Sequence, residues 1–169
     1  MTNWVSPQAC WDDLGEGRHL FDLPLFGNYR VDVRLKPLKE EDGELTLLLG
    51  ADESLEGGAH IKAQCAGGML TAQLLLGDRI LASGSAASEA PAPVLVVERD
   101  GDAIIASLAD ELKQTTLLAH QVGGALTGRR LGFRAGGLSP GPGEVHVRSD
   151  GILDQTFSGA ATDWRGGAG

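Results

Sequence analysis

The sequence predicts an all-β fold in which two antiparallel sheets pack face to face as a sandwich. About ten or eleven short segments alternate between apolar and polar residues, with turn residues between them. The chain of 169 residues contains 25 glycines, a surplus that favours tight turns over long helices. No segment of useful length follows the helical period, so helices do not compete with this interpretation.

The first expected strands flank a charged turn. Residues 29–35 (YRVDVRL) alternate strictly between apolar and polar side chains. Residues 44–50 (ELTLLLG) read as a returning strand, and Pro37 and Asp42-Gly43 mark the turn between them. We therefore expect these two strands to form a hairpin.

A second group of strands surrounds two glycine turns. Residues 60–65 (HIKAQC) and 69–76 (MLTAQLLL) are predicted to pair around a Gly-Gly turn, and a short strand is expected at 79–82. Residues 83–93 (SGSAASEAPAP) are small, polar and interrupted by two prolines, which predicts a loop.

The clearest predicted hairpin joins residues 94–99 (VLVVER) and 102–108 (DAIIASL). Its turn is expected at Asp100-Gly101, because Asp-Gly suits the positive φ angles of a type I′ turn. Both strands are nearly continuous in apolar residues, so the hairpin should lie centrally in its sheet. A further strand pair is expected within 109–122, turning near Asp110-Glu111, with a helical turn there as the alternative. Single strands are expected at 130–135 (RLGFRA) and 144–148 (EVHVR).

Length and charge restrict the domain count and the partners. The length predicts one domain, which we place at residues 1–151, followed by a tail at 152–169. A net charge of -9 repels a phosphate backbone, so no nucleic-acid partner is expected. No apolar run reaches the length of a spanning helix, so no membrane partner is expected. The first residues show no secretory signal, and localisation stays open.

The two cysteines, Cys10 and Cys65, lack the close spacing of a zinc or redox motif. They either pair across the fold or remain two small buried residues in a reducing compartment. We favour the second alternative, because a domain of this size does not need a bridge for stability.

The order of these strands resembles the concanavalin A-like jelly roll. The resemblance covers roughly residues 20 to 150. It rests on YRVDVRL, ELTLLLG, HIKAQC with its Gly-Gly turn, VLVVERDGDAIIASL, RRLGFRAGG and EVHVRSDG. That superfamily includes laminin G-like modules and bacterial domains related to 3-keto-glycoside hydrolases. The resemblance implies the sandwich fold, but it does not single out an activity, because this fold hosts lectins, glycosidases and inert spacers alike.

The tail carries apolar residues that a linker would not need. Phe157 and Trp164, with the following Gly-Gly, resemble the first half of an opening strand pair in this superfamily, and Trp4-Val5 resembles the second half. The tail would then pack beside the N-terminus of its own chain, supply a strand to a neighbouring copy, or begin a further domain. The residues expected to close or assemble the fold in this way are Ile152, Leu153, Phe157 and Trp164.

Acidic residues offer two weak chemical motifs. Glu40, Asp42 and Glu44 resemble the E-x-D-x-E signature of a β-glucanase family, but here they surround a turn, so we expect a solvated tip and assign no catalytic residue. The acids that could gather at loop ends around Ca²⁺ are Asp52, Glu53, Glu56, Asp100 and Asp102. Surface acids that keep the domain soluble are the interpretation we favour, so neither a metal nor another cofactor is expected.

Aromatic side chains are the expected means of sugar recognition. A sugar stacks its apolar face on an exposed ring, and the candidates are Trp4, Trp11, Trp164 and Tyr29. All three tryptophans lie in the terminal segments, so they would line a shared groove or staple those segments to the sandwich, and we favour the staple.

The function expected from these observations is a non-enzymatic binding or structural module, with glycan as the default ligand. The alternatives are a glycoside-acting hydrolase, whose acids would converge in a cleft, and a self-assembling protein joined through its C-terminal strand.

Overall fold

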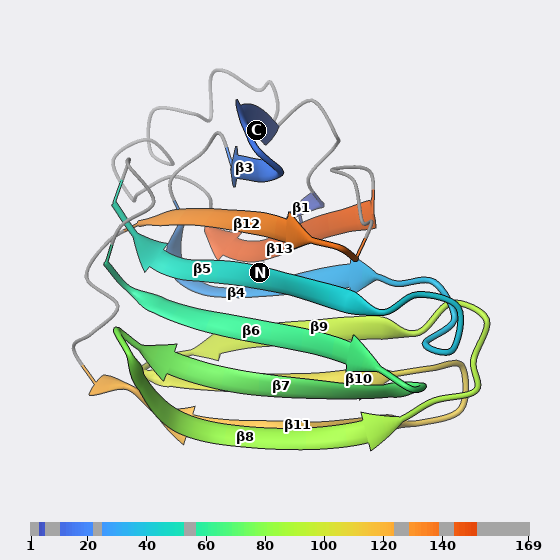
Figure 1. The fold of residues 1–169 in the computed structure, drawn as a ribbon. Coiled ribbons are helices and arrows are strands. Elements are labelled where there is room, and N and C mark those ends of the chain that lie inside the picture. Colours follow the sequence, from blue (N-terminus) through green and yellow to red (C-terminus); the bar gives the residue numbers. More distant parts are fainter. Residues whose placement is uncertain are drawn as a thin grey trace.

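The computed structural model describes residues 4–5, 11–21, 25–52, 57–123, 129–138 and 144–151. Within these ranges the chain forms thirteen strands and two sheets, and every strand pair is antiparallel. The predicted all-β sandwich is confirmed. Figure 1 shows one sheet in front of the other. No helix long and apolar enough to cross a membrane occurs in this part of the chain.

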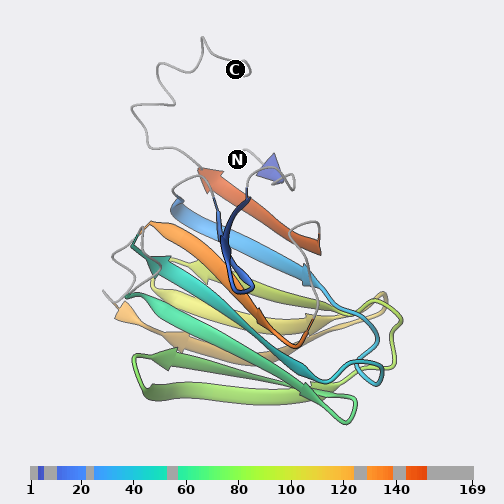
Figure 2. The same ribbon diagram turned by 45° about the horizontal axis from the view of Figure 1, so that its top comes forward.

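The rear sheet in Figure 1 has six strands in the order β1-β13-β4-β9-β10-β11. Their bounds are β1 Trp4–Val5, β13 Val145–Gly151, β4 Phe26–Arg34, β9 Val94–Asp100, β10 Ala103–Ala109 and β11 Gln114–Gln121. β1 pairs with the end of β13, so the described N-terminal strand forms one edge of this sheet, as Figure 2 also shows.

The front sheet has seven strands in the order β2-β3-β12-β5-β6-β7-β8. Their bounds are β2 Trp11–Gly15, β3 Arg18–Phe21, β12 Arg130–Gly136, β5 Gly43–Ala51, β6 Ala59–Ala66, β7 Met69–Leu76 and β8 Arg79–Ala87. The sequence analysis did not predict β2 and β3.

The core lies between the sheets and follows from the alternation of each strand. In β6, for example, Ile61, Ala63 and Cys65 are buried, whereas Lys62 and Gln64 point outward. The side chains with no exposed surface at all include Phe21, Val31, Val33, Leu45, Leu47, Leu49, Ile61, Leu70, Leu74, Leu95, Val97, Ile104, Leu131, Phe133, Val145 and Val147. Thus one face of each sheet is apolar, and the other is free to carry polar side chains.

The predicted hairpin between 29–35 and 44–50 is wrong, because β4 and β5 belong to different sheets. β4 pairs with β13 and β9, and β5 pairs with β12 and β6. The connecting residues 35–42 are more numerous than a tight hairpin needs, and they are long enough to cross the roughly 10 Å between packed sheets. Leu35 and Leu38 of this connection are buried and anchor it over the end of the core.

The predicted loop at 83–93 is also wrong in its first half, because β8 continues to Ala87. The residues are small because β8 lies against β11 at the edge where the two sheets converge. A Cβ atom on Gly84 would overlap the Leu117 carbonyl of β11, so only glycine allows this approach.

The hairpin of β9 and β10 is confirmed, and it lies centrally in the six-stranded sheet as predicted. Its turn is shifted by one residue, because Asp100 pairs with Ala103 and the turn residues are Gly101 and Asp102. Gly101 alone has a positive φ, of 61°, which is typical of a type II′ turn and not of the expected type I′. The strand pair predicted within 109–122 is wrong, because β11 is the one strand described there. β11 pairs instead with β10, and this hairpin turns at residues 110–113.

Candidate functional site

The structure places two of the predicted sugar-stacking aromatics in the core. Trp11 is 8% exposed and packs edge-on against Phe21 and Phe133, with ring centroids 5.1 and 4.9 Å apart. Tyr29 is 5% exposed, and burial raises the pKa of its phenol to about 12. Neither ring presents a face to a sugar. The contacts of Trp11 are those expected of a staple that holds the β2–β3 hairpin to the sandwich.

The remaining predicted site residues give less information. Trp4 lies in β1 opposite Ser149, and its side chain is outside the described part of the structure. The four tail residues expected to close or assemble the fold, Ile152, Leu153, Phe157 and Trp164, also lie outside the described residues.

The E-x-D-x-E acids do not share one strand face. Glu40 and Asp42 are exposed on the connection between the sheets, and the Asp42 carboxylate accepts a hydrogen bond from the Gly67 amide at 3.3 Å. Glu44 lies on the outer face of β5, where it pairs with Lys62 at 3.5 Å. The arrangement does not deliver two carboxylates from one strand into a cleft, as glycoside hydrolysis on this motif would require.

The acids considered for Ca²⁺ are dispersed in the part that is described. Asp100 and Asp102 lie at the β9–β10 turn, Asp52 follows β5, and Glu53 and Glu56 lie outside the described residues. Among described residues, no three His, Cys, Asp or Glu side chains gather as metal ligands would.

A small cavity of about 170 Å³ lies at the end of the sandwich near the β4–β5 connection. Its lining residues are Arg34, Leu35, Lys36, Leu38, Glu41, Cys65, Leu138 and Glu144. It is smaller than the usual range of about 300–1,000 Å³ for ligand pockets.

Cys65 borders this cavity as a free, buried thiol that donates to the Leu38 carbonyl oxygen at 3.2 Å. Burial, with the nearby carboxylates of Asp42 and Glu41, raises the pKa of this thiol, so it stays protonated and is a poor nucleophile at neutral pH. Cys10 lies outside the described residues.

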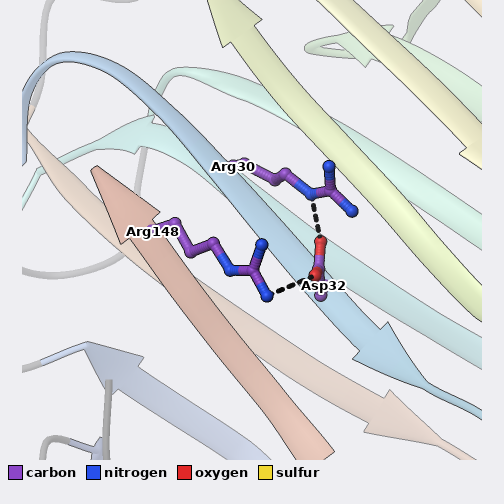
Figure 3. Close-up of polar contacts among 3 residues, drawn as sticks. All are labelled: Arg30, Asp32 and Arg148. Carbon is purple, nitrogen blue, oxygen red and sulfur yellow. Dashed lines mark hydrogen bonds and ion pairs between the residues drawn. The ribbon is translucent and has the colours of Figure 1, made fainter. Parts of the chain in front are cut away.

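The outer face of the six-stranded sheet carries charges that compensate one another. Asp32 of β4 lies between Arg30 and Arg148, at 2.6 Å from the first guanidinium and 4.0 Å from the second (Figure 3). Glu98 of β9 lies directly opposite Arg30 in the register. Arg34 lies on the same face of β4, so three arginines share this face with the two carboxylates, and Asp32 pairs with two of the three.

The outer face of the seven-stranded sheet differs in composition and in charge. Its side chains fall into three rows that cross the strands, because directly paired residues of neighbouring strands point to the same side. We call them the basic row, the hydroxyl row and the apolar row. The basic row is Arg18, Arg134, Thr46, Lys62, Gln73 and Ser83; the hydroxyl row is Glu44, Gln64, Thr71 and Ser85; the apolar row is Leu20, Leu48, His60, Leu75 and Ile80.

The basic row contains two arginines with no opposing carboxylate. Arg134 lies directly opposite Arg18 in the β12–β3 register. Within the described residues neither arginine forms an ion pair, and the buried Nε of Arg18 has no hydrogen-bond partner. Like charges in directly opposite positions repel each other, so this pair lowers stability unless something neutralises it.

His60 shows that the arginine charge extends over the neighbouring row. Burial, and then the positive charge of Arg134, lowers the pKa of His60 below its usual value of 6.5. His60 is therefore a neutral imidazole at pH 7, able to donate one hydrogen bond and accept another.

Two side chains of the hydroxyl row are hydrogen-bonded to each other. The hydroxyl groups of Thr71 and Ser85 are 2.8 Å apart and hydrogen-bonded across the β7–β8 pair. Gln64, next to them on β6, is exposed. These groups can both donate and accept hydrogen bonds, which suits a ligand that is rich in hydroxyl groups.

Comparison with solved structures identifies the class of fold. The VIP36 exoplasmic/lumenal domain in its Ca²⁺/Man2-bound form is similar with a TM-score of 0.59 and 12% identity, over 96% of this chain and 85% of that one. The CBM2 module of the evolved Dit of Lactobacillus casei BL23 phage J-1 has a TM-score of 0.58 and 13% identity, over 81% and 70%. A legume lectin-like domain from Entamoeba histolytica has a TM-score of 0.50 and 10% identity, over 78% and 74%.

The VIP36 and legume lectin-like domains have concanavalin A-like jelly-roll folds, so the resemblance in fold inferred from the strand order is confirmed. The chain has the fold of a two-sheet antiparallel jelly roll. No protein-family model and no curated protein sequence matches it.

The sequence analysis missed the outer face of the seven-stranded sheet as a site. The signal was present in the polar positions of the alternating strands, such as Lys62 and Gln64 in HIKAQC. Their neighbours across the sheet come from distant segments, however. Arg134 reaches this face only because β12 inserts between β3 and β5.

Proposed function

We propose that this protein is a non-enzymatic module that binds a glycan on the outer face of its seven-stranded sheet. The observation that carries the proposal is the arrangement of three parallel rows on this face, in which hydroxyl and amide groups lie beside apolar side chains. A sugar ring has the same two characters, since its hydroxyl groups lie around its edge and its C–H groups form apolar faces.

The basic row lies between the hydroxyl row and the apolar row, and the three rows would contact different parts of a sugar. Gln64, Gln73 and Thr71 provide donors and acceptors within hydrogen-bonding reach of one ligand, because adjacent strands are about 4.8 Å apart. Leu75 and Ile80 provide apolar surface, and Ile80 is 53% exposed. The structural similarity to a VIP36 domain bound to Ca²⁺ and Man2 supports glycan as the ligand class.

A glycan-binding assay with matched variants tests this proposal. Gln64→Ala combined with Gln73→Ala should raise the Kd for the best glycan found on an array by about tenfold, because each lost hydrogen bond contributes about 0.5–1.5 kcal/mol. Gln114→Ala with Gln121→Ala makes the same change on β11 of the other sheet and should leave Kd unchanged. Thermal unfolding checks that both variants fold.

Two outcomes would contradict the proposal. One is equal loss of binding in the β6–β7 and β11 variants, and the other is an array on which the folded protein binds nothing. Hydrolysis of β-glucans that disappears in Glu40→Gln with Glu44→Gln would show instead that the module is an enzyme.

A further inference from the structure

The basic row of the seven-stranded sheet has a charge opposite to that of the whole protein. The chain carries a formal charge of -9, yet Arg18, Arg134 and Lys62 are aligned on one row of this face. Only Lys62 has a carboxylate partner among the described residues, namely Glu44 at 3.5 Å. The local field over Arg18 and Arg134 is therefore positive in an acidic molecule.

Neighbouring acids do not cancel this field. Asp12 of β2 lies opposite Leu20, which is two residues from Arg18 along β3 and on the same face. Asp12 forms no ion pair within the described residues. Glu44 extends its side chain over Gly136 toward β12, but its carboxylate is paired with Lys62. Among the described residues, the two guanidinium groups thus lie side by side without a carboxylate partner.

The two arginines, unpaired among the described residues, lower the stability of the folded protein, and this points to a ligand that would neutralise them. A directly opposed arginine pair is destabilising on its own, and a buried Nε without a partner adds a desolvation penalty. Either cost disappears when an anionic group bridges the two guanidinium groups, because arginine binds carboxylate and sulfate-like oxygens through paired N–H donors.

We infer that the glycan held on this face is an acidic polysaccharide, whose carboxylate or sulfate group binds between Arg18 and Arg134. This inference rests on the proposed function, which supplies the hydroxyl and apolar rows that hold the rest of the sugar chain. The basic row spans about 24 Å from β3 to β8 at about 4.8 Å per strand, so several sugar rings can lie along it. The acid group then occupies the β3–β12 end, and neutral rings extend toward β7 and β8.

A simple phosphate site is a weaker interpretation of these residues. The row continues from the arginines through Thr46 and Lys62 to Gln73 and Ser83, which are uncharged. Nucleic acid or an anionic membrane would meet the repulsion of the remaining acidic surface. A polysaccharide with spaced charges suits a short basic segment followed by neutral polar groups.

The test compares polysaccharides that differ only in charge. Dextran sulfate is measured against dextran, and polygalacturonate against its methyl ester, by titration calorimetry at low and at physiological salt. At least one acidic form should bind at least tenfold more tightly than its neutral partner, and the difference should shrink as salt rises.

Charge-removing variants locate the binding. Arg18→Gln and Arg134→Gln should each weaken binding of the acidic form by about tenfold or more, because a charge-assisted hydrogen bond contributes about 1.5–3 kcal/mol. Arg148→Gln removes the same charge from the outer face of the other sheet and should leave binding unchanged. Melting temperatures of the Arg18 and Arg134 variants should not fall, since the opposed pair is relieved.

The outcomes separate this inference from the proposed function. Binding of neutral and acidic forms with equal affinity would overturn the inference and leave the glycan module intact. Absence of binding to every polysaccharide would overturn both. Equal binding to single-stranded DNA or to phosphatidylserine vesicles, or equal loss in Arg148→Gln, would show non-specific attraction to polyanions and would overturn the inference.

Discussion

His60 is the residue of the outer face whose protonation state reports on its surroundings. The groups that face it are Arg134 and Lys62 from neighbouring positions, with Glu44 on the far side of Lys62. Because burial and Arg134 lower its pKa, the folded protein takes up this proton at a lower pH than the unfolded chain. Stability that depends on neutral His60 is therefore present above about pH 6.5 and declines as the pH falls below that value.

We expect the imidazole of His60 to titrate below pH 6.5 in an NMR titration, with His60→Gln used to assign its resonance. Arg134→Gln should move the pKa of His60 upward, because it removes the second cause of the shift. Arg148→Gln, on the opposite face, is the control and should not move it. A wild-type pKa at or above 6.5 would contradict the described environment.

Trp11 illustrates why residue type alone did not identify a site. An exposed tryptophan and a buried one have the same letter in the sequence, and stacking on a sugar requires the exposed form. In the structure Trp11 contacts Phe21 and Phe133, which come from β3 and β12. Its role is to hold an edge hairpin, and the polar side chains of neighbouring strands are left to form the candidate site.

At the scale of elements, β8 and β11 determine how the sandwich closes. They are the edge strands of the two sheets on the same side of the molecule, and they lie close together in Figure 1. Small residues on the inner side of β8, including Ala82, Gly84 and Ala86, allow this approach. The same composition made this segment look like a loop in the sequence.

Gly84→Ala should lower the free energy of unfolding by about 1–3 kcal/mol or more, because the new methyl group would overlap the Leu117 carbonyl and neither backbone can move easily. Urea unfolding followed by tryptophan fluorescence measures this. Ser83→Ala, at an exposed position of the same strand, should change the stability by less than about 0.5 kcal/mol. Equal stability of Gly84→Ala and wild type would mean that the two edges do not approach as described.

At the scale of the whole molecule, the strand nearest the N-terminus, β1, pairs with β13, which is the last strand that the structure describes. β1 pairs with Ser149 and Arg148 of β13, so Trp4-Val5 forms the outer edge of the six-stranded sheet. The expectation that residues 152–169 pack beside this segment stays a prediction. Its alternatives are donation of the tail to a neighbouring copy and the start of a further domain.

Truncation after Gly151 distinguishes these alternatives. Closure onto its own chain is the expected arrangement, because it avoids the entropy cost of association. Burial of Phe157 and Trp164 would contribute about 2–3 kcal/mol each, so the truncated chain should melt about 10 °C lower. Phe157→Ala with Trp164→Ala in the full chain should reproduce most of this loss.

Size-exclusion chromatography with light scattering supplies the second measurement. A truncated chain that loses an oligomer but keeps its melting temperature would show that the tail is donated between copies. A truncated chain that keeps both properties would show that the tail belongs to neither arrangement.

Local pattern was sufficient for most strands and for the fold class. The strands at 60–65 and 69–76, and the hairpin around residue 101, follow from alternation and from turn residues close in sequence. The β4–β5 connection could not be read in this way, because a charged turn looks the same whether it returns to its own sheet or crosses to the other. The short strands β2 and β3 contain too few residues for their period to be visible.

The sequence by itself determined that this chain is an all-β sandwich of antiparallel strands. That information is local, since a period of two and a glycine turn each need only a few consecutive residues. Only the tertiary structure decided which side chains share a face. Arg18, Arg134 and His60 belong to three separate segments, and they share the outer face because β12 inserts between β3 and β5, which places Arg134 opposite Arg18 and lets its charge act on His60. Strand pairing over long sequence separations creates this juxtaposition, and no local pattern encodes the partner of an edge or inserted strand.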